Sequence, residues 1–222
     1  MPSPADLLPL LIQNLGANAS LGTLSNVAAW DRYEAFVWLL VIQAARDEGA
    51  QVSLQDVNLN PATSPVFRTS PGVISSNAQL YTHAVITFPN KPVLEAHVGV
   101  QIAGKSTVSH ECDVVVLDRV EALACRESGA NPRYKATLII AECKYYPTSN
   151  LSLKLSREFL GFCREMRKID CFFVASRSSA PVLRVLSHSN CHRQTNVLPN
   201  TQQAVSLVHA FREKFNHFKA LN

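Results

Sequence analysis

The chain has 222 residues and is 47% hydrophobic, which is enough apolar material for the core of one α/β domain spanning residues 1–222. Charged residues make up only 17%, which argues against disorder and for a compact body with large buried faces or partner surfaces. The net charge of +4 permits contact with a polyanion such as nucleic acid but does not require it.

Three features bear on the cellular compartment. The longest apolar run, residues 35–42, is far shorter than the ~20 residues that a membrane span needs, so no membrane association is expected. The segment MPSPADLLPLL lacks the basic leading region of a secretion signal. The six cysteines include no CxxC pair, and several lie in apolar segments where a free thiol behaves as a small hydrophobe. We therefore expect a cytoplasmic protein without structural disulfides.

Hydrophobic periodicity and turn residues divide the chain into helices and strands. After a helical N-terminal extension over residues 1–25, helices are predicted at 27–48, 151–168 and 201–222, the last one amphipathic. Strands are predicted at 81–88, 93–103, 108–118, 136–146 and 171–176, and the connector 119–135 is expected to hold a short helix. A mixed β-sheet flanked by helices on both faces accommodates this order, so the predicted fold class is α/β.

Two neighbouring predicted strands carry charged residues within apolar surroundings. Side chains i and i+2 share one face of a strand, roughly 6.6 Å apart, so Glu142 and Lys144 point the same way, as do Glu111 and Asp113. Unpaired charge on an apolar strand is unfavourable, and a divalent cation held by Asp113 and Glu142 would compensate it. Mg²⁺ or Mn²⁺ prefers such hard oxygen ligands, and the backbone carbonyl of Cys143 would be a further one.

Such a site would suit the hydrolysis of a phosphodiester. The cation would polarise the ester and lower the pKa of a bound water, and Lys144 would orient that water or stabilise the transition state. Alternatively, Asp113, Glu142 and Lys144 form a structural ion pair at a strand end, which is common and of small energetic weight. The apolar character of both strands favours the metal site. Glu111 is either an auxiliary ligand or an exposed residue at the sheet edge.

The segments ECD at 111–113 and ECK at 142–144 resemble the signature of the PD-(D/E)XK nuclease superfamily, here in the form D-x(28)-E-x-K. Cys112 stands where the name-giving proline would be, and the separation of the two halves is long. The resemblance spans roughly residues 27–180. It implies a restriction-endonuclease-like core with catalytic Asp113, Glu142 and Lys144. Many members also place a helical glutamate near the metal, and Glu34 matches it, although a solvated helix residue is the alternative.

The resemblance implies a Mg²⁺- or Mn²⁺-dependent nuclease, most simply a DNA endonuclease of a prokaryotic defence or DNA-processing system. It would act as a homodimer or as one subunit of a larger complex. The alternative is a non-catalytic nuclease-fold subunit that binds nucleic acid or a protein partner. The helix after the E-x-K strand is expected to turn polar residues inward, with Lys154 and Arg157 as nucleic-acid contacts. A solvated polar face explains these two side chains as well.

His97 is a further predicted nucleic-acid contact, because histidine titrates near neutral pH. The alternative is a hydrogen-bonded strand histidine that shares a face with Glu95. Other hydrolytic chemistries find no support in the sequence. The segment HECD is not the HExxH zinc motif, the PCxxC part of a deaminase signature is absent, and neither GxSxG nor a P-loop occurs.

Overall fold

The computed structural model describes residues 29–221 except 69, 79, 168 and 169. Its strands are β1 (Gln51–Asp56), β2 (Pro61–Ala62), β3 (Thr82–Thr87), β4 (Leu94–Ala103), β5 (Ser109–Asp118), β6 (Thr137–Lys144), β7 (Cys171–Ala175) and β8 (His192–Gln194). Its helices are α3 (Ala29–Asp47), α4 (Arg119–Ser128), a 3₁₀ turn (Tyr134–Ala136), α5 (Leu153–Glu165), α6 (Ala180–His188) and α7 (Gln202–Leu221). The expected extension over residues 1–25 lies outside the described residues.

The described strands form one eight-stranded sheet in the order β2-β1-β3-β4-β5-β6-β7-β8. Neighbours from β2 to β6 are antiparallel, whereas β6, β7 and β8 are parallel. A parallel neighbour requires a crossover, and α5 and α6 supply the two crossovers on this side of the sheet. The predicted mixed sheet in an α/β fold is therefore confirmed.

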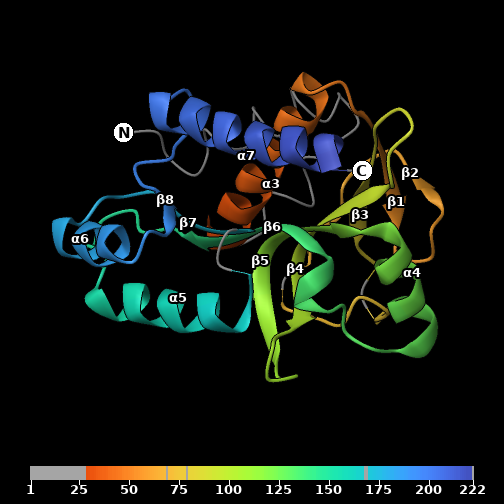
Figure 1. Cartoon of the computed structure of the whole chain (residues 1–222), viewed down its shortest axis with the longest axis horizontal. Coiled ribbons are helices and arrows are strands. Elements are labelled where there is room, and N and C mark those ends of the chain that lie inside the picture. The colour runs from red at the N-terminus through yellow and green to blue at the C-terminus, as the bar shows by residue number, and fades with distance from the viewer. Residues whose placement is uncertain (1–28, 69, 79, 168–169, 222) are drawn as a thin grey trace.

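Helices cover both faces of the sheet (Figure 1). On one face, α3 and α7 pack on the strands through a core that includes Tyr33, Trp38, Phe211 and Phe215. On the other face, buried residues of α4, α5 and α6 pack against the alternate residues of β4 to β7. Along β6 the side chains alternate between the two cores, with Ile139, Ala141 and Cys143 in the first and Ile140 in the second. In β4 and β5 this alternation is interrupted level with Gly99 and Asp113, since Val98 and Val114 lie in the first core but Val100 and Cys112 lie in the second.

Most predicted elements are confirmed, with ends shifted by a few residues, including the short helix in the 119–135 connector, which is α4. The sequence did not predict β1, β2, α6 or β8. Of these, β1 and β8 have half-exposed or exposed side chains, so their apolar pattern is weak. All six cysteines are buried and lie outside any disulfide bond of the described residues. Among the described helices, none has a stretch whose length and apolarity would carry it across a bilayer.

Candidate metal centre

The pairing of strands β5 and β6 ends next to the residues of the D-x(28)-E-x-K motif. Their ladder runs up to the pair Val114–Ala141, and Asp113 and Glu142 come next. There the Asp113 side chain replaces the backbone ladder, because its Oδ2 accepts the N–H of Cys143 at 2.6 Å. On its other edge, β6 stays paired with β7 as far as Lys144–Ala175. The end of β6 is thus held on both sides, which fixes the backbone that carries Glu142 and Lys144.

The three charged side chains converge; we call Asp113, Glu142 and Lys144 the Asp113 site. The Nζ atom of Lys144 lies 2.9 Å from Glu142 Oε2 and 3.6 Å from Asp113 Oδ2. The side chains of Asp113, Glu142 and Lys144 are 10%, 16% and 25% exposed. Solvent therefore reaches the lysine end of the site, while the carboxylates are largely desolvated.

Desolvation shapes the charge states of the Asp113 site. Burial, followed by repulsion from Asp113, raises the pKa of Glu142 to about 7. Burial also raises the pKa of Asp113, although Lys144 and the Cys143 N–H oppose the shift. Burial alone would lower the pKa of Lys144, but the two carboxylates raise it, so this side chain is a cation at neutral pH. A second nearby cation would favour ionisation of both carboxyl groups.

Glu142 and Lys144 face the core formed with α5, because they have the strand parity of Ile140. Glu111 is exposed near the start of β5. Its negative charge still adds to the burial and Asp113 effects that raise the pKa of Glu142. Glu111 therefore lies within electrostatic reach of the site, which keeps it as a possible auxiliary ligand.

Glu34 lies on the other side of the sheet. Its helix, α3, packs on the face that holds Val114, Ala141 and Cys143. Burial raises the pKa of the Cys143 thiol, and the charges of Asp113 and Glu34 raise it further, so Glu34 is near the end of β6. The structure thus brings Glu34 close to the backbone of the motif but does not place it on the face that Glu142 and Lys144 share.

The prediction that the helix after the E-x-K strand turns polar residues inward is wrong. Lys154 and Arg157 are both exposed on α5, and Ser156, Phe159 and Cys163 form its buried side. Lys154 pairs with Glu158 one turn away at 3.6 Å, with both side chains more than half exposed. Both basic side chains remain accessible to a polyanion, and the solvated-face alternative stays open.

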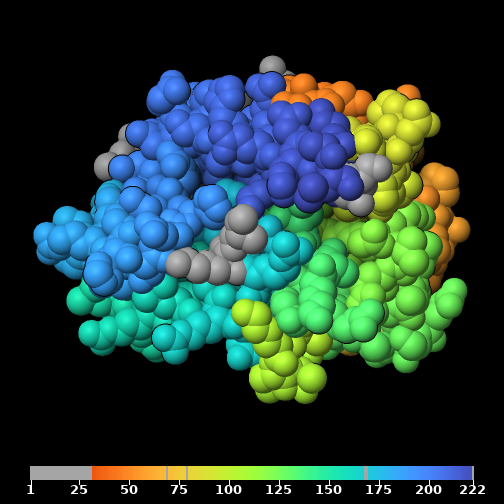
Figure 2. Space-filling view, viewed as in Figure 1, coloured from red at the N-terminus to blue at the C-terminus, as the bar shows by residue number. Residues whose placement is uncertain are grey.

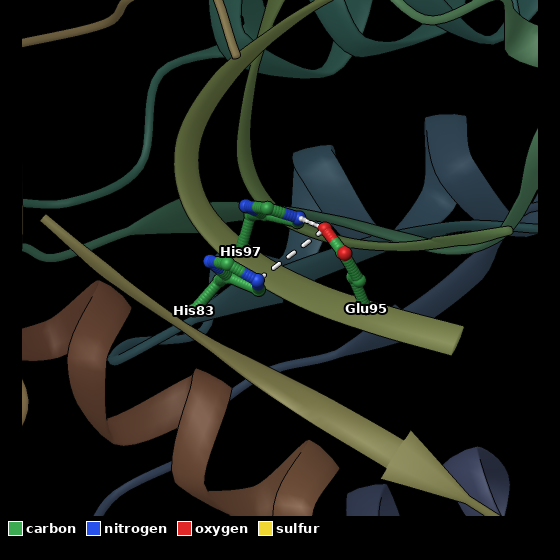
Figure 3. Close-up of side chains that lie close together, drawn as sticks. All are labelled: His83, Glu95 and His97. Atoms are coloured by element: carbon green, nitrogen blue, oxygen red, sulfur yellow. Dashed lines mark hydrogen bonds and ion pairs between the residues drawn. The ribbon is translucent and has the colours of Figure 1, made fainter. Parts of the chain in front are cut away.

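The prediction that His97 contacts nucleic acid is also wrong, because this residue is 0% exposed. Its Nε2 lies 2.9 Å from Oε2 of Glu95, which confirms the alternative of a hydrogen-bonded strand histidine. His83 of β3 joins the same carboxylate, with Nε2 at 3.6 Å from Oε2 (Figure 3). The two imidazole rings stack with centroids 4.8 Å apart.

Two arginines from α4 complete what we call the Glu95 cluster, namely His83, Glu95, His97, Arg119 and Arg126. Arg126 donates hydrogen bonds to both carboxylate oxygens of Glu95, from NH1 to Oε1 at 3.1 Å and from NH2 to Oε2 at 2.6 Å. Arg119 NH1 lies 3.0 Å from Oε1. Burial alone would raise the pKa of Glu95, but hydrogen bonds from both histidines and Arg126 hold it well below the usual range. Burial lowers the pKa of His97 to about 4, so this imidazole is neutral at pH 7.

Sequence reasoning missed His83, Arg119 and Arg126 as members of one cluster. The available signal was Glu95 within the apolar run VLEAHVGV, because a buried carboxylate on a central strand requires partners. The partners themselves come from a neighbouring strand and from α4, and their proximity depends on how that helix packs on the sheet.

A cavity of about 610 Å³ lies between the C-terminal half of α7, the start of α4 and the start of β6. In Figure 2, the dark blue end of α7 lies beside the green segment that contains α4. The lining of the cavity includes Leu94, Lys135, Phe218 and Leu221 but no residue of the Asp113 site. It is at the opposite end of β5 and β6 from Asp113 and Glu142, so it is not a substrate pocket for that site.

No protein-family model, curated protein or solved structure matches the chain. The motif and its geometry therefore carry the functional argument.

Proposed function

We propose that the protein is a metal-dependent nuclease with a restriction-endonuclease-like core, and that it hydrolyses phosphodiester bonds at the Asp113 site. The observation that carries the proposal is the convergence of Asp113, Glu142 and Lys144 where β5 and β6 part. The order of elements supports it: α3, antiparallel strands, the E-x-K strand, the α5 crossover and the parallel strand β7.

The residues present fit a divalent cation. Two largely desolvated carboxylates face one lysine, and the donor atoms are hard oxygens, which Mg²⁺ and Mn²⁺ prefer. Asp113 and Glu142 would hold the ion, with the Cys143 carbonyl as a third ligand. A bound ion of this kind would supply a nucleophilic water near neutral pH and would polarise the phosphate.

Each residue of the site has a distinct task. Asp113 is fixed by the Cys143 N–H, so its carboxylate is already oriented before any ligand arrives. The ammonium of Lys144 would orient the attacking water and offset the charge that develops on the phosphate. Its ion pair with Glu142 holds it in place. Glu34 would act only from the end of β6, across the sheet, and we expect its replacement to matter less.

The substrate is nucleic acid, with DNA favoured over RNA. Lys154 and Arg157, exposed on α5, would contribute attraction to the phosphate backbone. The role would be in prokaryotic defence or DNA processing, in the cytoplasm, as a homodimer or beside a partner subunit. Double-strand cleavage commonly uses two copies of a site, which motivates the homodimer.

Cleavage assays test this proposal. Plasmid, linear duplex, single-stranded DNA and RNA are incubated with Mg²⁺, Mn²⁺ or a chelator. We expect metal-dependent cleavage that Asp113→Asn, Glu142→Gln and Lys144→Ala each reduce by at least about 100-fold. Glu213→Gln, an exposed carboxylate on α7, is the matched control and should leave cleavage unchanged. Cleavage that persists in all three site variants would falsify the proposal.

The second candidate is a non-catalytic nuclease-fold subunit that binds nucleic acid or a protein. The 2.9 Å ion pair between Lys144 and Glu142 favours it, because this contact compensates the buried carboxylate without any metal. Calorimetric titration with Mn²⁺ separates the two candidates. The nuclease requires Mn²⁺ binding that Asp113→Asn abolishes, and the binding subunit retains nucleic acid with no Asp113-dependent metal binding.

A further inference from the structure

The Glu95 cluster contains the donor atoms of a metal site, independently of the nuclease proposal. His83 Nε2, Glu95 Oε2 and His97 Nε2 lie within 4.8 Å of one another, and all three residues are buried. Figure 3 shows both imidazole rings turning one nitrogen toward the carboxylate. Two histidines and one glutamate form a donor set that zinc and similar transition metals accept.

A guanidinium group already stands beside these donors. Arg126 NH2 lies 2.6 Å from Glu95 Oε2 and 3.5 Å from His83 Nε2. Arg119 adds a second positive charge at 3.0 Å from the other carboxylate oxygen. A divalent ion added to this arrangement would place its charge beside two guanidinium groups, with a single carboxylate to compensate them in a buried setting. A metal ion and the Arg126 guanidinium would therefore compete for the same carboxylate oxygen.

We propose that His83, Glu95 and His97 form a transition-metal site whose cation position is filled by the Arg126 guanidinium. The protein with Arg126 excludes the metal, and a protein without this side chain binds one Zn²⁺ or Co²⁺ ion at the same donors. The side chain of Arg126 is only 9% exposed, so its truncation to alanine opens space beside the donor atoms while the three ligands keep their strand positions.

The surroundings limit the affinity of this site. A ligating histidine is usually fixed by a hydrogen bond at its other ring nitrogen. The Nδ1 atoms of His83 and His97 are both buried and have no hydrogen-bond partner in the described part of the chain. The rings are instead positioned by stacking on each other and by Tyr81, whose ring centroid lies 6.2 Å from that of His97. We therefore expect weaker binding than at a structural zinc site.

The experiment uses the full chain carrying Asp113→Asn, which removes the other proposed metal centre. Three proteins are compared: this background, the background with Arg126→Ala, and that double variant with His97→Asn added. Co²⁺ is the probe because its visible absorption reports nitrogen-containing, low-coordinate sites, and Zn²⁺ is then tested in thermal unfolding. Exposed histidines such as His188 and His209 are present in all three proteins, so any weak metal binding by them contributes equally to the three measurements.

The proposal predicts one Co²⁺ per chain with a visible absorption band only in the Arg126→Ala protein. Zn²⁺ at 100 times its Kd should raise the Tm of that protein by about 5 to 10 °C and should leave the other two unchanged. Equal Co²⁺ binding with and without Arg126, or a folded Arg126→Ala protein that takes up no metal, overturns it. If Arg126→Ala is unfolded without metal, Zn²⁺ must restore cooperative unfolding and must fail to do so with His97→Asn; no restoration also overturns it.

Discussion

At the scale of single residues, Glu142 experiences two opposing effects. Its carboxylate is largely desolvated and close to Asp113, which disfavours ionisation, and it depends on Lys144 for charge compensation. A group arranged for a ligand commonly lowers the stability of the ligand-free protein. A metal centre and a structural ion pair therefore differ in how the stability changes when either partner is removed.

We expect Glu142→Gln to stabilise the metal-free protein by about 1 kcal/mol, because a neutral amide removes the repulsion from Asp113. Lys144→Gln should destabilise it by about 1 to 3 kcal/mol, because two carboxylates are then left without a cation. Urea unfolding in the presence of a chelator measures both changes. If the two variants lose stability equally, the contact is a structural ion pair.

His97 makes the stability of the fold sensitive to acid. Its pKa is about 4 in the folded protein because of burial, against about 6.5 in an unfolded chain. Between these pH values the unfolded chain binds a proton that the folded protein does not, so stability falls as the pH drops from 6.5 to 4. The loss from this residue is about 3 kcal/mol over the window. Unfolding curves at several pH values should show a shallower dependence for His97→Gln; an unchanged slope would exclude this role.

The sequence placed Asp113, Glu142 and Lys144 together correctly in space, because strand periodicity and the pairing of two consecutive strands suffice for that. The predicted contact of His97 with nucleic acid is wrong, because the burial of a strand residue depends on what packs over it. Arg126 contacts Glu95 from α4, although it lies 31 residues from Glu95 in the chain. No local pattern reports such a contact.

At the scale of elements, two glycines differ in whether their backbone conformation requires glycine, one in strand β4 and one in helix α5. Gly99 lies in β4 between the pairs Val98–Val114 and Val100–Cys112, level with Asp113, and has φ of +64°. Its carbonyl accepts the N–H of Gly72, which ties the 65–80 connection to the sheet. Gly161 lies within α5 and is exposed, and a Cβ atom there would meet nothing within 4 Å.

Gly99→Ala should destabilise the protein by about 1 kcal/mol or more, because an L-residue is strained at positive φ. Gly161→Ala should stabilise it by about 0.5 to 1 kcal/mol through the higher helix propensity of alanine. Thermal unfolding of both variants measures the difference. A stabilising Gly99→Ala would show that the strand does not need the left-handed conformation. Because Gly99 is level with Asp113, we also expect Gly99→Ala to weaken Mn²⁺ binding.

The elements that the sequence failed to predict share a physical cause. The outer strands β1 and β8 have partly exposed side chains and a weak apolar alternation, so only pairing with an existing strand defines them. The helix α6 is short, begins with Ala180-Pro181 and ends at a polar segment. Its two buried residues, Val182 and Leu186, are too few to produce a clear helical period.

At the scale of the whole molecule, the sheet has an antiparallel half and a parallel half that meet at β6. The Asp113 site lies at this boundary, with Asp113 on the last antiparallel partner and both other residues on the shared strand. The Glu95 cluster lies further along the same pair of strands, since its His97 pairs with Val115, two residues from Asp113 on β5. The exposed turn between β4 and β5, which projects at the lower edge in Figure 2, is fastened to the end of α5 through Glu165.

This arrangement has a consequence for the order in which the chain folds. Strands β3, β4 and β5 follow one another through short turns, whereas α4 lies between β5 and β6 and α5 lies between β6 and β7. Closing a longer loop costs more chain entropy, so the hairpins should form first. Pulse-labelling hydrogen exchange during refolding should then protect the amides of β4 and β5 before those of β7. Asp113 would be in position early, and the reactive centre would be completed late, when the newly arriving β6 brings Glu142 and Lys144 against a preformed template.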